Sequence, residues 1–447
     1  MEVTPIATPL PGGTFRSLRS RNYRLWAAGA LVSNIGTWMQ RTAQDWIVLA
    51  ELTPHNATAV GIVMALQFGP SLLLLPVTGF AADYFDRRKL LLVTQGAQGV
   101  LALVLGLLTI SGVVDLWHVY AFAFLLGCVT AFDAPARQTF VAELVSDSLL
   151  SNAVALNSTS FNAARMVGPA IAGVLIAGIG TGWVFLINAA SFIAVIVALA
   201  LLRVDELYRK ERAVRKQGSF LEGFRYLAAR PDLLTILGML FLIMTFGINF
   251  PVFVSAMAIK VFHAGSGAFG MLSSMLAIGS VTGALFAARR EKPRLLFLLA
   301  GAAIFGVGLA IAALMPTFAL FGAALILVGW SAQTFNTTAN SAVQLLTEPV
   351  MRGRVMAIYM GIALGCTPLG APLVGWVADT WGPRWSIAVG ASSGFLAAAL
   401  GIAYLVRYRG LQLHLIDGRM KFSLAGREPP VERRGVALHT PPDPQPK

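Results

Sequence analysis

Apolar residues run in long stretches along the chain, and charged residues are confined to short segments between them. A stretch free of Asp, Glu, Lys and Arg, such as 52–82, is long enough for a membrane-spanning helix, which needs roughly 20 apolar residues. Two stretches, 166–202 and 295–347, are long enough for two helices each, and both contain a breaking cluster, at Gly178–Gly182 and Met315–Thr317. The pattern predicts twelve spanning helices, near 24–50, 60–82, 90–112, 117–138, 151–178, 183–202, 233–259, 268–288, 295–315, 317–340, 355–378 and 385–406.

Composition narrows the class of protein. Of the 447 residues, 56% are hydrophobic and only 12% are charged, whereas a soluble domain has roughly 25% charged residues. This excludes a disordered chain, a disulfide scaffold and a cytosolic enzyme, and it leaves an all-α membrane protein whose first partner is the lipid bilayer. The net charge of +13 fits basic loops beside anionic lipid, and no basic helix or aromatic pattern predicts nucleic acid as a partner. The five histidines lack metal-ligand spacing, so we expect no metal site.

Basic residues alternate between the two sides of the predicted helices. One side holds the N-terminal arm, the Arg87–Lys89 turn, the central segment and the C-terminal tail, and the other side holds only Lys260 and Arg384. The positive-inside rule then places both termini in the cytoplasm. We expect the chain to lie in the cytoplasmic (inner) membrane. The expected domains are a cytoplasmic N-terminal arm, a six-helix bundle, a partly helical cytoplasmic linker, a second six-helix bundle and a mostly disordered cytoplasmic tail, at residues 1–21, 22–203, 204–232, 233–406 and 407–447.

The two halves of the chain resemble each other. Val77-Thr78-Gly79 recurs as Val281-Thr282-Gly283, and a spaced set of three glycines and a tryptophan recurs 202 positions later. Chance similarity between Gly-rich helices is the alternative. The constant register favours two pseudo-symmetric six-helix bundles related by an axis along the membrane normal. The members of the spaced set are Gly168, Gly173, Gly180 and Trp183 in the first half and Gly370, Gly375, Gly382 and Trp385 in the second.

A charged turn follows the second predicted helix and is a candidate conformational switch. It runs from Gly79 through Asp83 and Asp86 to Arg87 and Arg88. A glycine permits close helix approach, and a carboxylate at the membrane edge can face the positive end of another helix. Such contacts can lock one arrangement of two bundles and release another. A solvated basic turn would explain the arginines but not the two acidic residues.

This turn resembles the loop 2–3 signature of the major facilitator superfamily. Gly79, Asp83, Arg87 and Arg88 match the signature, whereas Tyr84 and Asp86 depart from it. The departures put one ionic contact of the family in doubt.

Further segments resemble the branch of that superfamily that contains enterobactin-type siderophore exporters and macrolide-efflux-like permeases. They are Phe132–Gln138, Leu156–Gly173 and Asn188–Phe192. The resemblance implies the major facilitator fold and a secondary active antiporter that exports a small amphipathic molecule, of the drug or siderophore class, by alternating access. It also implies that the proton gradient, rather than a cofactor, supplies the energy. We expect a monomer.

Charges inside the predicted spans are the candidates for proton coupling. A charge in hydrocarbon costs about 2.5–3.5 kcal/mol on insertion scales and therefore tends to face a cavity or a partner. Arg41 and Asp45 share one helix face, as do Asp133 and Arg137, and Arg165 lies in the fifth span. The alternative is that these residues form ion pairs that only fix helix packing.

Polar and aromatic residues within the spans form a candidate substrate cavity. A second set, of Gly and Pro residues in the fifth and eleventh spans, is a candidate for close packing and hinge motion. Ordinary interhelical hydrogen bonds are the alternative for any single polar residue. The cavity set is Asn34, Trp38, Gln44, Gln67, Asn157, Asn162, Phe246, Asn249, Gln333, Asn336 and Asn340. The packing set is Gly168, Pro169, Gly173, Pro368, Gly370, Pro372 and Gly375.

Three other kinds of membrane protein are alternatives to an exporter. A lipid or lysolipid translocator on the same fold is the main alternative. A polytopic membrane enzyme is disfavoured because the spans hold no His/Asp cluster and the chain has no nucleotide-binding loop, so we predict that the protein is not an enzyme. A channel is disfavoured because no filter-like repeat is present.

Overall fold

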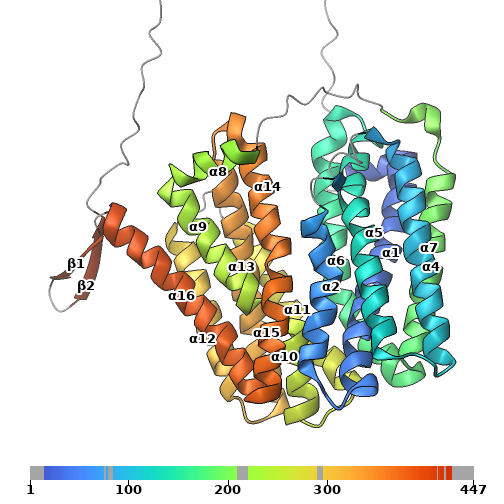
Figure 1. The fold of residues 1–447 in the computed structure, drawn as a ribbon. Helices are drawn as coiled ribbons and strands as arrows, with labels where there is room; N and C mark the ends of the chain where they lie inside the picture. Colours follow the sequence, from blue (N-terminus) through green and yellow to red (C-terminus); the bar gives the residue numbers. More distant parts are fainter. Residues whose placement is uncertain are drawn as a thin grey trace, which may run out of the picture.

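Two helical bundles lie side by side in the computed structural model, which describes residues 15–74, 77–78, 84–208, 220–288, 295–409, 411–416 and 419–424 (Figure 1). The first bundle begins with a short turn, η1. Its elements are η1 (Arg16–Arg19), α1 (Arg21–Trp46), η2 (Ile47–Leu52), α2 (Ala57–Leu73), α4 (Arg87–Ile110), α5 (Leu116–Phe140), η3 (Val141–Glu143), α6 (Asp147–Ile179) and α7 (Thr181–Ala200).

The second bundle follows a linker that contains two short helical elements, η4 (Val204–Glu206) and α8 (Phe220–Ala228). Its elements are α9 (Pro231–Leu242), η5 (Ile243–Gly247), α10 (Phe250–Ala256), η6 (Met257–Val261), α11 (Ser266–Ala288), α12 (Leu295–Leu314), α13 (Phe318–Leu346), α14 (Pro349–Gly365), α15 (Thr367–Thr380) and α16 (Pro383–Arg409).

Ten helical segments of the described residues are long and apolar enough to cross a membrane. The predicted helical membrane fold is therefore confirmed. The first two predicted spans coincide with α1 and α2, which fall outside this set. Helix α2 has only 17 residues, and α1 carries Arg41 and Asp45 among many polar side chains.

Two predicted spans are interrupted by proline. The span near 355–378 is divided between α14 and α15 at Cys366, and Pro368 lies in the first turn of α15. The span near 233–259 is divided before α10, and Pro251 lies in the first turn of that helix. Proline lacks an N–H donor and disfavours helical geometry in the residue before it, so a helix begins there more easily than it continues. Each interrupted segment, Pro231–Val261 and Val350–Thr380, is still long and apolar enough to cross a membrane, so both predicted spans are present with a break inside them.

The predicted disordered tail contains regular structure at its start. Strands β1 (Leu411–Ile416) and β2 (Arg419–Leu424) pair antiparallel, with Leu411 opposite Leu424. Leucine alternates with polar residues at 411–415, and Asp-Gly at 417–418 is a pair typical of tight hairpin turns. Sequence reasoning did not single out this hairpin, and the expectation of a mostly disordered tail stays a prediction. The rest of the tail, from 425, lies outside the described residues.

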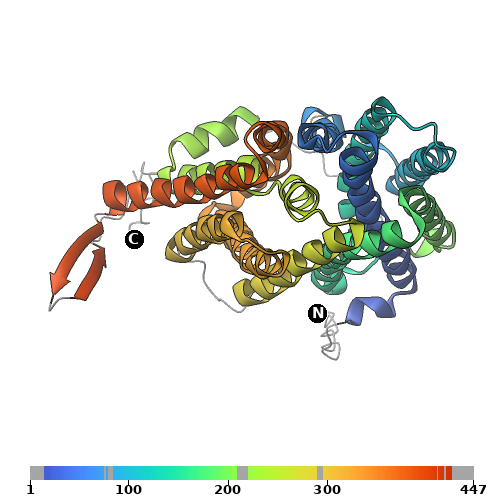
Figure 2. The same cartoon turned by 90° about the horizontal axis from the view of Figure 1, so that it is seen from below.

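The two halves meet through two helix pairs. Helix α2 packs along α15, and α6 packs along α11 (Figure 2). Gly173 of α6 lies against Gly270 of α11, and Gly375 of α15 lies against the backbone of Ala57 and Thr58 in α2. A side chain at either glycine would collide with backbone, so both positions keep the halves in close contact.

The glycines of the internal repeat occupy matching environments. Gly173 and Gly375 are equivalent in the repeat, and each lies at a contact between the halves. Gly180 and Gly382, the next equivalent pair, both have positive φ, at 86° and 100°. Only glycine adopts that conformation without strain, and each precedes or begins the turn into the next helix. Matching backbone conformation argues against chance similarity.

Candidate functional site

A dense polar network surrounds Asp133 inside the first bundle. One carboxylate oxygen accepts hydrogen bonds from Thr94 Oγ1 at 2.7 Å and Gln95 Nε2 at 2.6 Å, and the other accepts from Nε and Nη2 of Arg137 at 3.1 and 2.9 Å. Arg137 Nη1 donates to Asn34 Oδ1 at 3.0 Å. Helices α1, α4 and α5 are thereby joined by one neutral ion pair. We call these five residues the Asp133 network.

Arg41 and Asp45 have a different environment, although both are also buried. No ion pair joins them among the described residues, because the Arg41 guanidinium lies over the rings of Trp38 and Phe68, at 5.1 and 4.5 Å from their centres. Asp45 Oδ1 is buried without a hydrogen-bond partner in the described part of the chain. The predicted shared face is present, but among the described residues the carboxylate and the guanidinium on it do not form an ion pair with each other.

Arg165 is exposed on α6 and reaches across to the second half. Its Nη2 lies 3.3 Å from Gln333 Oε1 on α13. Ser158, Phe161 and Asn162 are also exposed and lie one and two turns earlier on the same face of α6. On α13, Gln333 Nε2 donates to Thr337 Oγ1 at 3.3 Å. An open polar stripe of α6 therefore faces a polar stripe of α13.

The remaining cavity candidates divide into two groups. Gln67 donates to Gln44 at 2.8 Å, Tyr359 donates to Asn336 at 3.0 Å, and Trp38 packs edge-on against Phe161 with ring centres 6.0 Å apart. Others bond to residues four positions away along the chain or pack against the core, so the structure does not bring the whole set together. Asn162 donates to Ser158, and Asn249 donates to Thr245. Asn340 accepts from Gln344, and Phe246 packs against the core.

The charged turn is only partly described, since Gly79 and Asp83 lie outside the described residues. Asp86 caps the N-terminus of α4 and accepts from Lys89 N at 3.0 Å. Arg87 pairs with Glu143, and Arg88 Nε donates to Leu199 O at 2.8 Å. All of these contacts lie within the first half.

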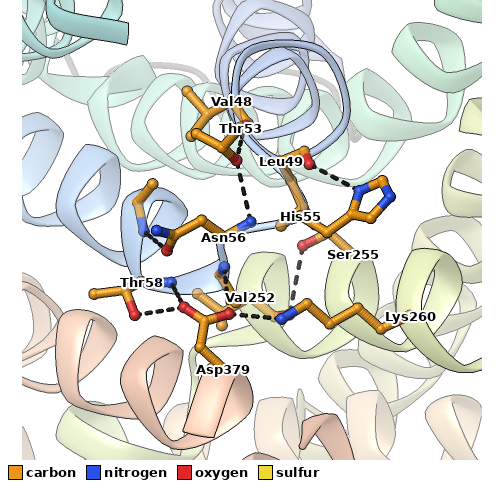
Figure 3. Close-up of polar contacts among 12 residues, drawn as sticks. Val48, Leu49, Thr53, His55, Asn56, Thr58, Val252, Ser255, Lys260 and Asp379 are labelled. Carbon is orange, nitrogen blue, oxygen red and sulfur yellow. Dashed lines mark hydrogen bonds and ion pairs between the residues drawn. The ribbon is translucent and has the colours of Figure 1, made fainter.

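A cluster that sequence reasoning missed joins the two halves around Asp379, in the last turn of α15 (Figure 3). Its carboxylate accepts from the backbone N–H groups of Ala57 and Thr58, both at 2.8 Å, and from the Thr58 hydroxyl at 2.6 Å. Lys260 Nζ lies 2.6 Å from Asp379 Oδ1. We call these four residues the Asp379 cluster. Since Ala57 and Thr58 begin α2, an anion of one half caps a helix of the other.

The loop before α2 holds that helix end in place. Asn56 accepts from Ala59 N at 2.9 Å, which leaves the N–H groups of Ala57 and Thr58 free for Asp379. Thr53 Oγ1 donates to Val48 O at 2.6 Å and accepts from Asn56 N at 3.1 Å (Figure 3). The sequence contained one signal for the Asp379 cluster. An acidic residue at the C-terminal end of a helix, as Asp379 is, opposes the helix dipole and needs a compensating partner.

A family model described as "transmembrane secretion effector" matches residues 12–423. The chain belongs to this family of the major facilitator superfamily. It is therefore a multi-pass membrane transporter and not an enzyme, as the sequence resemblance predicted.

Curated relatives of the chain are transporters of low sequence identity. The staphyloferrin A transporter of Staphylococcus aureus is 28% identical over 78% of this chain and 87% of its own length. The multidrug efflux pump Tap of Mycolicibacterium fortuitum is 28% identical over 84% and 92%. The enterobactin exporter EntS of Shigella flexneri is 26% identical over 80% and 85%.

Solved structures support the fold. A bacterial homologue of the lysosomal transporter Spinster, in an inward-facing and unoccupied conformation, is 13% identical with a TM-score of 0.65, over 86% of this chain and 95% of that chain. The nucleoside transporter NupG is 12% identical with a TM-score of 0.68, over 86% and 99%.

Proposed function

We propose that the chain is a proton-coupled exporter that moves a small amphipathic molecule across the cytoplasmic membrane by alternating access. The family supports a secretory role, and the relatives are named as exporters or transporters of siderophores and drugs. The proposal includes twelve spans with both termini in the cytoplasm. Helix α1, with 26 residues, has the position and length of the first span, and α2, with 17 residues, has the position of the second. We also propose a monomer.

The Asp379 cluster is the observation that carries alternating access. It joins α15 to the start of α2 through contacts that exist only while the two halves touch at that end. Its residues lie beside the predicted outer loops, where Lys260 is one of two basic residues. We infer that the cluster closes the outer face in the state described here, and that it breaks when the transporter opens outward.

A charge-removing variant tests this gate. Asp379→Asn removes the charge-assisted bonds to the N-terminal end of α2 and to Lys260. Each of these bonds is worth about 1.5–3 kcal/mol. We expect the ratio of outer-closed to outer-open molecules to fall by roughly tenfold to a hundredfold. The measurement is the distance distribution between spin labels at Pro54→Cys and Trp381→Cys, in a background with Cys128 and Cys366 replaced by serine.

Asp115→Asn is the matched control. Asp115 is also an acidic cap at the start of a helix, α5, but that helix belongs to its own half. We expect the control to keep the parent distance distribution. An unchanged distribution in Asp379→Asn would remove the cluster from the gating mechanism.

Transport is tested with the purified full chain in lipid vesicles. An imposed pH gradient should drive the movement of at least one compound from a panel of dyes, macrolides and siderophores, and collapse of the gradient should stop it. Movement that is independent of the gradient would reject proton coupling, and the absence of movement for the whole panel would reject this substrate range.

For the proton site, the geometry favours Asp45 over Asp133. A carboxylate held by Arg137 and two further donors cannot take up a proton without breaking an ion pair, whereas Asp45 has a free buried oxygen. Its neighbour Arg41 is engaged with aromatic rings rather than with the carboxylate.

A further inference from the structure

Arg165 is a cation between the two halves, and no acidic side chain of the described residues pairs with it. Among the described residues, its guanidinium donates a hydrogen bond to the neutral amide of Gln333, at 3.3 Å, and forms no ion pair. In contrast, Arg137 on α5 forms an ion pair with Asp133, one turn earlier on the same helix. A charge inside a membrane protein is costly unless it is paired or faces a water-filled path used by a charged ligand. Arg165 has an exposed side chain and forms no ion pair in the described part of the chain, which favours the second case.

The surroundings of Arg165 add apolar and hydrogen-bonding surface. Phe161, one turn before Arg165, is 44% exposed and packs edge-on against Trp38. Ser158 and Asn162 are exposed on the same stripe, and across the gap Gln333 and Thr337 offer further polar atoms. A ligand lying here would meet an aromatic wall, neutral polar groups on both halves and one free guanidinium.

We propose that this stripe is the substrate-binding site and that it selects molecules with an anionic oxygen group, a carboxylate or a phosphate, on an aromatic or otherwise apolar body. Arg165 binds the anion, because guanidinium groups bind carboxylate and phosphate oxygens strongly. Phe161 and Trp38 cover the apolar body, and Gln333 bonds to Arg165 from the opposite half. This inference rests on the proposed transport function and names its substrate class.

The test is a binding comparison between two probes that differ in charge but hardly in shape. We use 7-methoxycoumarin-3-carboxylate and its carboxamide, measured by fluorescence anisotropy with the full chain in phosphatidylcholine nanodiscs. We expect the carboxylate to bind about tenfold to a hundredfold more tightly than the amide, since a hydrogen bond to a charged group is worth about 1.5–3 kcal/mol.

Variants assign that preference to Arg165. Arg165→Gln should reduce it to roughly threefold or less, and Arg165→Lys should restore a part of it because the charge returns without the forked geometry. Arg203→Gln removes one exposed positive charge from the same half and should keep the parent preference. Thermal unfolding checks that every variant is folded.

Each outcome decides the proposal. A preserved preference in Arg165→Gln, equal binding of the two probes, or binding of neither would overturn it. If phosphatidylglycerol in the nanodiscs displaces the carboxylate only when Arg165 is present, the anion site is supported and its ligand is a lipid phosphate. A different outcome is that the protein binds the carboxylate more tightly than the amide but vesicles transport neither the probes nor any panel compound. That result would reject the transport function and would still support the anion site.

Discussion

Replacing Asp133 with alanine should lower the stability of the folded transporter by about 3–5 kcal/mol, the usual cost of leaving one member of a buried ion pair without its partner. The Arg137 guanidinium would stay buried, and the side chains of Thr94 and Gln95 would lose their acceptor. The measurement is thermal unfolding of the purified protein in detergent, together with the yield of protein extracted from the membrane.

A double variant separates the loss of the pair from the loss of function. In Asp133→Leu with Arg137→Met, both charges are gone and no unpaired ion remains, so most of the stability should return. If Asp133→Ala is as stable as the parent protein, the network does not hold α1, α4 and α5 together, and Asp133 becomes a proton-site candidate again.

Replacing Asp45 with asparagine should abolish transport driven by a pH gradient while leaving the fold intact. The side chain keeps its size, and no ion pair is broken, because the nearby guanidinium of Arg41 lies over aromatic rings. Asparagine cannot carry the coupling proton, so we expect gradient-driven flux to fall to the background of empty vesicles.

Exchange of labelled for unlabelled substrate at equal pH is the internal control for Asp45→Asn. Exchange needs binding and alternating access but no net proton movement, so it should persist in the variant. Asp45→Glu keeps a carboxyl group and should retain a measurable part of the gradient-driven flux. Gradient-driven flux at the parent rate in Asp45→Asn would exclude this carboxyl as the coupling group.

Local sequence patterns predicted what depends on neighbours along the chain. The spacing of Asp133 and Arg137 placed them on one helix face, and the structure pairs them. The same spacing placed Arg41 and Asp45 on one face, but there the guanidinium turns to the rings of Trp38 and Phe68. Periodicity gives the direction in which a side chain leaves the helix and not the partner that it meets.

Contacts between distant segments were beyond the reach of the sequence. Thr94 and Gln95 looked like ordinary polar residues of an apolar helix until the fold placed them at Asp133. Asp379 lies just past the end of a charge-free stretch, and its partners in α2, more than 300 positions away, include two backbone N–H groups. A backbone N–H group has no residue type, so no composition or motif could name it.

The use of backbone N–H groups as partners of Asp379 affects how the gate tolerates mutation. Half of the Asp379 contact is made by the peptide backbone of Ala57 and Thr58, and every residue except proline supplies the same N–H group. In a saturation mutagenesis screen, the second half of the chain would show a sharp requirement at position 379. The first half would accept nearly any small side chain at position 57, with proline as the exception. Related sequences can therefore diverge at position 57 while keeping the backbone part of this contact.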